Sequence, residues 1–183
     1  MNIWHDIEEK RINRDNFIAC IEISKGSKMK YELDKTTGRL ILDRVLYTST
    51  HYPANYGFIP RTYADDNDPL DVLVLCNEVI DPLCLVKCYP IGVIKMIDSD
   101  EIDEKIIAIC EGDPSMNCYK DIKDLPAHVF DEISHFFTVY KELENKKTSV
   151  TEILGREDAM RIIDDCILKY KHKFLRKILN MHE

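Results

Sequence analysis

The sequence predicts an α+β fold in which a small closed or partly closed β-barrel is flanked by two main helices. Apolar, β-branched segments separated by turn residues fill the first two thirds of the chain, whereas the last third shows helical apolar spacing. Strands followed by helices in this order favour an α+β architecture. A length of 183 residues suits one domain, residues 1–183, with a sizeable core.

Six strands are expected in the first part of the chain. The first is apolar and β-branched except at Glu22, the second alternates polar and apolar residues, and a turn at residues 34–38 precedes the third. The long fifth strand should bend near Pro90 or Gly92. The residues from His51 to Pro60 form a loop or an extended piece, and Ser99–Glu104 forms a polar turn. The expected strands are Phe17–Ile23, Lys30–Leu33, Arg39–Leu46, Val72–Cys76, Leu85–Ile97 and Lys105–Cys110.

Two helices are expected after the strands. Apolar residues recur at helical spacing from Pro126 to Glu144, and Pro126 suits a helix start. A second apolar stripe runs from Arg156 to about Asn180. Five basic residues and no acid lie between residues 169 and 177, which is typical of the solvated face near a helix C-terminus.

Composition excludes several classes of protein. The chain is 45% hydrophobic and 32% charged, and it contains no apolar run near the ~20 residues that span a bilayer. The N-terminus lacks the pattern of a secretion signal, so we expect a cytoplasmic protein. The net charge of -8 argues against nonspecific nucleic-acid binding. Seven cysteines without a CxxC pair indicate buried, reduced thiols, and Cys84 and Cys88 alone cannot form a zinc site.

The most informative segment is an acidic run at residues 66–71. Asp66, Asp68 and Asp71 lie within six residues, and two side chains at i and i+2 of an extended segment share a face. Carboxylates gathered at one site repel each other unless cations neutralise them, and hard oxygen ligands favour Mg²⁺, Mn²⁺ or Ca²⁺. The residue types alone also allow a solvated acidic loop, whereas the spacing does not match a calcium-binding EF-hand.

Other polar residues gain interest only if the fold brings them to one cavity. A hairpin would place Asp98 near Asp103, with Lys105 on the same face as Asp103. On sequence grounds each remaining position also has an ordinary interpretation, as a hairpin tip, a barrel rim, a packed tyrosine or an exposed lysine. These positions are Glu22, Lys30, Glu32, Arg44, Tyr52, Tyr56, Tyr140 and Lys141.

Taken together, these motifs resemble the family I soluble inorganic pyrophosphatases, and the length resembles the bacterial type. The signature D-x-D-P-hydrophobic-D of that family matches residues 66–71. The resemblance extends over about residues 17–145, in order and with compatible spacing. The other matching segments are Ile21–Ile23, Lys30–Glu32, Asp43–Arg44, Tyr52–Gly57, Gly92–Asp98, Asp103 with Lys105, and His135–Phe137 with Tyr140–Lys141.

The resemblance implies an OB-like barrel and the hydrolysis of pyrophosphate to two phosphates with several Mg²⁺ ions per site, for which Mn²⁺ can substitute. It also implies a role for each matched residue. Asp66, Asp71 and Asp103 would bind an activating metal, Asp98 and Asp103 a metal that enters with substrate, and Glu32 would help to hold another. Asp68 would be the general base for a metal-activated water. Phosphate would be bound by Lys30, Arg44, Tyr56, Lys105, Tyr140 and Lys141, with Glu22 and Tyr52 in support.

The resemblance further implies a homo-oligomer, with a hexamer favoured, whose partners are pyrophosphate and phosphate rather than nucleic acid or a membrane. The match fades after Lys147, where a tryptophan-containing segment of bacterial relatives is missing. Two alternatives differ in function class. One is a catalytically inactive metal-binding or phosphate-binding protein. The other is an OB-type module for nucleic acid, which would need a basic groove with exposed aromatic side chains.

Overall fold

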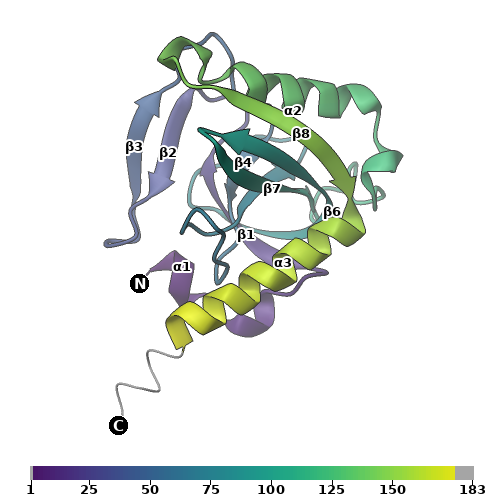
Figure 1. The fold of residues 1–183 in the computed structure, drawn as a ribbon. Coiled ribbons are helices and arrows are strands. Elements are labelled where there is room, and N and C mark those ends of the chain that lie inside the picture. Colours follow the sequence, from purple (N-terminus) through teal and green to yellow (C-terminus); the bar gives the residue numbers. More distant parts are fainter. Residues whose placement is uncertain (1, 176–183) are drawn as a thin grey trace.

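A computed structural model describes residues 2–175 of the chain, and its core is a mostly antiparallel sheet. The strand order β1-β4-β5-β7-β6-β8, with an additional pairing of β1 to β6, closes the first five of these strands into a ring (Figure 1). The predicted partly closed, OB-like architecture is therefore confirmed. The strands are β1 (Phe17–Ile23), β4 (Asn55–Phe58), β5 (Asp71–Leu75), β6 (Leu85–Asp98), β7 (Glu101–Cys110) and β8 (Thr148–Gly155).

One parallel pairing in this sheet decides where the acidic run lies. β5 and β7 run parallel, with Asp71 opposite Lys105, whereas the other pairings are antiparallel. The acidic run ends at the first residue of β5, and the Asp98–Asp103 hairpin leads into β7. The two acidic segments therefore meet at the same edge of the ring.

A separate hairpin stands beside the ring. β2 (Met29–Leu33) and β3 (Leu40–Val45) pair only with each other, with Lys30 opposite Arg44. Figure 1 shows this hairpin standing apart from the main sheet. The strand β1 is buried along its whole length, whereas the hairpin strands are mostly exposed or half-buried. The hairpin is thus free to place polar side chains over one edge of the ring.

Two helices cover the ring on different sides. α2 (Ala127–Val139) packs Ile133, Phe136 and Phe137 into a cluster with Tyr52 and Tyr56. α3 (Arg156–Tyr170) packs the buried side chains of its inner face into a second cluster, with residues of β1, β5, β6 and β7. The short N-terminal helix α1 (Ile3–Asp6) lies near the C-terminal end of α3 (Figure 1). In residues 2–175 no helix is both long enough and apolar enough to cross a membrane.

Several boundaries differ from the sequence prediction. The helix expected to reach Glu144 ends at Val139, followed by a 3-10 turn that Asn145 terminates with a φ of 57°. Thr148–Gly155 is a strand that we did not predict, although its β-branched residues favour one. The polar turn after β6 is limited to residues 99–100, since β7 already begins at residue 101. The last helix gives way to a π-helical turn at residues 171–175, and its predicted extension lies outside the described residues.

The segment from His51 to Pro60 contains β4, whose four residues are all buried. A Cβ atom at Gly57 would lie 1.9 Å from the carbonyl oxygen of Cys20 on β1. Only glycine allows so close an approach between backbones.

All seven cysteines are free, but Cys84 and Cys118 are exposed, so the expectation of uniformly buried thiols was wrong.

Candidate active site

The acidic run forms a compact loop between β4 and β5. Asp66 accepts a hydrogen bond from the backbone N–H of Asp68 at 3.0 Å, and the hydroxyl of Thr62 accepts one from Leu70 at 2.8 Å. Asn67 takes a φ of 70°, which asparagine tolerates better than most residues. Asp66 and Asp68 both line one cavity, as expected, but they do so from a turn rather than from the extended segment that the spacing argument assumed.

That cavity has a volume of about 220 Å³ and collects nearly all of the predicted site residues. The acids come from β1, from β2, from the loop that ends at the first residue of β5 and from the β6–β7 hairpin. The basic and phenolic groups come from β2, from β4 and the segment before it, from β7 and from the residues after α2. The predicted residues that line it are Glu22, Lys30, Glu32, Tyr52, Tyr56, Asp66, Asp68, Asp71, Asp98, Asp103, Lys105, Tyr140 and Lys141.

Lys105 lies at the centre of the cavity floor and is 3% exposed. Its Nζ is 2.6 Å from Asp71 and 2.9 Å from Asp103, and it donates to the Tyr56 hydroxyl at 3.0 Å. Burial alone would lower the pKa of Lys105, but the charges of Asp103 and Asp71 outweigh it and hold the pKa well above its usual range. Lys105 is therefore a fixed cation inside the acidic cluster.

The far wall of the cavity is built by the end of α2. Lys141 forms an ion pair with Asp98, and the Tyr140 hydroxyl lies 3.4 Å from the same carboxylate. Burial raises the pKa of Asp98, but the hydrogen bond and charge of Lys141 prevail and lower it. The simple expectation of an exposed Lys141 was wrong, because the helix ends at Val139 and turns the next residues toward the cavity.

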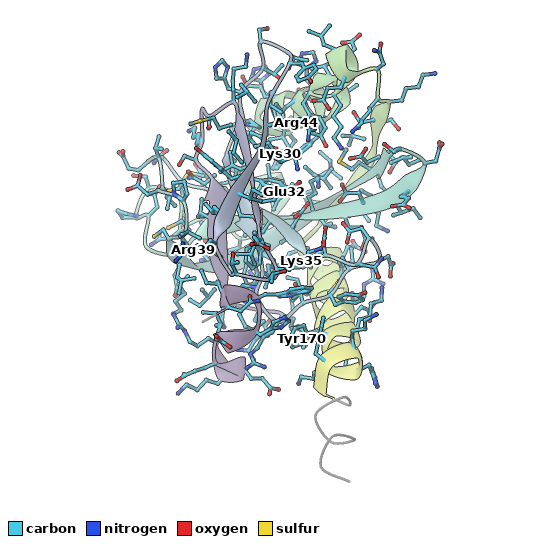
Figure 2. The ribbon with its side chains drawn as sticks, turned by 90° about the vertical axis from the view of Figure 1, so that its left-hand side faces the viewer. Lys30, Glu32, Lys35, Arg39, Arg44 and Tyr170 are labelled. Atoms are coloured by element: carbon cyan, nitrogen blue, oxygen red, sulfur yellow. The ribbon has the colours of Figure 1, made fainter. Side chains whose placement is uncertain are left out.

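The β2–β3 hairpin supplies the near wall. Lys30 forms an ion pair with Glu32 and lies 3.5 Å from Asp43 (Figure 2). Behind them Glu22 is buried and accepts a hydrogen bond from the Leu33 backbone at 2.7 Å. Burial, reinforced by the charge of Asp71, raises the pKa of Glu22 to about 8.

Arg44 is the one predicted residue that does not line the cavity. Its guanidinium donates to Glu144 at 2.8 Å and is also paired with Asp43. Among the described residues its Nη2 is the one buried side-chain nitrogen or oxygen without a hydrogen-bond partner. A buried donor left unsatisfied costs about 1–3 kcal/mol, so this atom is suited to bind an anion.

Comparisons with known proteins agree with this geometry. A family model described as inorganic pyrophosphatase matches residues 19–171. The chain belongs to the inorganic pyrophosphatase family. The chain is 45% identical to soluble inorganic pyrophosphatase 2 of Chlamydomonas reinhardtii, over 98% of this chain and 94% of that protein. The family resemblance noted in the sequence is confirmed.

Solved structures of this family share the fold. The inorganic pyrophosphatase of Helicobacter pylori superposes with a TM-score of 0.87 at 43% identity, over 91% of this chain and 99% of that one. The enzyme of Thermus thermophilus gives a TM-score of 0.88 at 36% identity, over 93% and 99% of the two chains. The departure seen after Lys147 therefore does not alter the overall architecture.

The family uses metal ions, and the donors of this cavity have the chemistry to hold them. Seven carboxyl groups face one space, and burial together with the charges of Asp71 and Asp103 raises the pKa of Asp66 to about 6. Hard oxygen donors of this kind suit Mg²⁺ and similar ions. In residues 2–175, however, no three acidic, histidine or cysteine side chains already form a compact coordination group. Asp71 and Asp103 lie against the ammonium group of Lys105, and Asp98 lies against that of Lys141.

The sequence interpretation missed Lys35 and Phe137, which also line the cavity. Lys35 belongs to the turn of the β2–β3 hairpin. It lies two residues after β2, the strand that carries the predicted site residues Lys30 and Glu32, and this closeness in sequence could have indicated that Lys35 also reaches the cavity. Phe137 looked like an ordinary member of the helical apolar stripe. Its ring centre lies 5.4 Å from the ammonium of Lys105, so it both packs in the core and forms part of the cavity wall.

Proposed function

We propose that this chain hydrolyses inorganic pyrophosphate to two phosphate ions in the cavity described above, with Mg²⁺ as its metal. The observation that carries the proposal is the meeting of the acidic loop with the Asp98–Asp103 hairpin around Lys105. Membership of the inorganic pyrophosphatase family supports the same conclusion.

The metal ligands in this proposal are carboxylates from three segments, and Mn²⁺ can substitute for Mg²⁺ because it takes similar oxygen ligands. When bound, the ions would neutralise the polyanionic substrate and increase the acidity of the attacking water. The chain itself contributes the arrangement of its acids around a largely enclosed space. The assigned ligands are Glu32, Asp66, Asp71, Asp98 and Asp103.

Asp68 is the proposed general base. It lies on the acidic loop, lines the cavity and is 48% exposed, so a water molecule can reach it. In the reaction one O–H bond of the water breaks and its proton passes to the Asp68 carboxylate. The water oxygen forms a bond to one phosphorus while the bond from that phosphorus to the bridging oxygen breaks. A positioned base of this kind contributes about 10²–10⁴-fold to the rate.

The basic and phenolic groups stabilise negative charge on the phosphoryl oxygens. Lys30, Lys105 and Lys141 each stand against a carboxylate of the cavity. Burial raises the pKa of Tyr56 and of Tyr140 well above their usual range, so both hydroxyls stay protonated and can donate. Arg44, whose buried Nη2 has no hydrogen-bond partner, would turn toward the cavity to donate to phosphate, and Glu22 and Tyr52 line the cavity as supporting residues.

The decisive experiment measures phosphate release from pyrophosphate by the purified chain, with and without Mg²⁺. We expect turnover that a chelator abolishes and that Asp68→Asn lowers by about 10²–10⁴-fold. Asp164→Asn is the matched control, since Asp164 is similarly exposed and pairs with Arg14 on another surface. Absence of turnover at every concentration of Mg²⁺ and Mn²⁺ would leave an inactive metal-binding or phosphate-binding protein as the better account.

We also propose a cytoplasmic location and a homo-oligomeric state, with a hexamer favoured, for a chain that folds as one domain. Free thiols at all seven cysteines suit a reducing compartment. Cell fractionation tests the location, light scattering gives the number of chains in the assembly, and a single unfolding transition is expected of one domain.

A further inference from the structure

Lys35 forms an ion pair with Asp68 across the mouth of the cavity. The two residues are 33 positions apart and belong to the hairpin turn and the acidic loop. Figure 2 shows Lys35 at the turn end of the hairpin, beyond Lys30 and Glu32. The side chains are 49% and 48% exposed, so both the pair and its surroundings are partly solvated.

The turn that carries Lys35 is held by its own hydrogen bonds. Asp34 accepts from the backbone of Thr36 at 3.0 Å through its side chain and from Gly38 at 2.7 Å through its carbonyl. The Asp34 N–H in turn donates to Arg39 at 2.8 Å. Gly38 takes a φ of 69°, which suits glycine. The backbone of Lys35 therefore has a defined position relative to the ring.

The N-terminal segment supports Lys35 from behind. The ammonium lies 5.9 Å from the centre of the Trp4 ring, within cation–π range, and the Asn2 side chain donates to the Lys35 carbonyl at 2.8 Å. Trp4 is buried, and its ring N–H donates to the carbonyl of Thr62 at 2.9 Å. The same tryptophan thus contacts Lys35 and anchors the segment that leads into the acidic loop.

Each of the other lysines around the cavity is paired with a different acid. Lys105 is paired with Asp71 and Asp103, and Lys141 with Asp98. Lys35 engages Oδ1 of Asp68, and an ammonium group held against one oxygen restrains the orientation of the carboxylate. We propose that Lys35 is a positioning residue that orients Asp68 for proton transfer. This inference rests on the proposed role of Asp68 as the base.

A positioning role and a structural role for Lys35 predict different effects on stability and on rate. An ion pair between half-exposed groups contributes at most about 1 kcal/mol to stability, so loss of Lys35 should leave the fold intact. Proton transfer is far more sensitive, because a misplacement of about 1 Å in a reacting group can cost about 10²-fold in rate. The loss should therefore appear in kcat rather than in the unfolding temperature.

The test compares three variants by steady-state kinetics with saturating Mg²⁺. Lys35→Met keeps an apolar chain of similar length over Trp4 but removes the charge, whereas Lys35→Arg keeps the charge. Lys87→Met is the matched control. Lys87 forms an ion pair with Glu111 at 2.8 Å, and the two side chains are 61% and 45% exposed. Lys87 lies near the start of β6, whereas Asp98 ends that strand.

We expect Lys35→Met to lower kcat about tenfold with KM changed less than about twofold, as for loss of orientation in the reacting state. Lys35→Arg should recover most of the rate, and Lys87→Met should match the wild type. Both methionine variants should unfold within about 4 °C of the wild type. In the Asp68→Asn background, Lys35→Met should cause no further loss of rate.

Two results would overturn the inference while leaving the proposed function intact. The first is a Lys35→Met variant with the kcat of the wild type. The second is an increase in KM, with kcat unchanged, that added salt abolishes. Lys35 would then only attract the anionic substrate. Failure of the wild type to release phosphate would instead refute the proposed function. Full activity of Asp68→Asn would refute the role of Asp68 as the base, on which this inference rests.

Discussion

Replacement of Lys105 by methionine tests whether the acidic cluster depends on a buried cation. The variant keeps the apolar stem but leaves Asp71 and Asp103 without the ammonium that lies 2.6 and 2.9 Å away. Removing one partner of a buried ion pair costs about 3–5 kcal/mol. The two carboxylate side chains keep 26% and 17% exposure, so water partly solvates them and the lower limit of about 3 kcal/mol applies.

For a chain of this length, each kcal/mol of lost stability lowers the unfolding temperature by about 2–4 °C. A loss of about 3 kcal/mol should therefore lower the unfolding temperature of Lys105→Met by about 6–12 °C when no divalent ions are present. Adding Mg²⁺ should stabilise the Lys105→Met variant more than the wild type, because its carboxylates no longer have a competing ammonium. Calorimetry or thermal unfolding followed by circular dichroism measures both quantities.

Lys95→Met is the control for this experiment. Lys95 also faces two carboxylates, those of Glu104 and Glu152, but at 3.8 and 3.9 Å and with 33% exposure. Its loss should cost less than about 1 kcal/mol. Equal losses in the two variants, or an unchanged unfolding temperature for Lys105→Met, would refute the view that Lys105 neutralises the acidic cluster.

Three further predictions concern the surrounding structure. Trp4→Ala should lower the free energy of unfolding by about 3–5 kcal/mol, measured by urea denaturation, since Trp4 is buried and bonds to Thr62. Gly57→Ala should strongly reduce the yield of folded protein, because its Cβ would overlap the carbonyl of Cys20, and a wild-type yield would contradict that contact. Glu22 has a folded pKa of about 8, above its unfolded value of 4.5, so its contribution to stability is present at low pH and is lost as the pH rises through 8. Glu22→Gln should therefore flatten the dependence of unfolding temperature on pH between about 5 and 8, and an unchanged profile would show that Glu22 is not the responsible group.

Much of the fold follows from local patterns. β1 has the boundaries predicted, because its run of apolar and β-branched residues, interrupted only by Glu22, favours a buried strand. The bend in β6 also appears where Pro90 and Gly92 predicted it, as an irregularity in the pairing with β7. The strand β8 was missed because it follows a helix end whose turn residues gave a weak boundary signal.

By itself, the sequence determined that Asp66, Asp68 and Asp71 share one short loop and that Asp98 and Asp103 share one hairpin. These are properties of residues close together in the chain, for which spacing and turn chemistry suffice. Resemblance to a family then joined the two groups into one expected site.

Only the tertiary structure decided which of these groups touch. The parallel pairing of β5 with β7 sets Asp71 opposite Lys105, and no local pattern encodes the pairing of strands so distant in sequence. The same holds for the contact of Lys35 with Asp68, which depends on how the hairpin stands over the ring. The grouping of the acids into two short segments is thus evident from the sequence, whereas the fold decides which lysine lies against each acid.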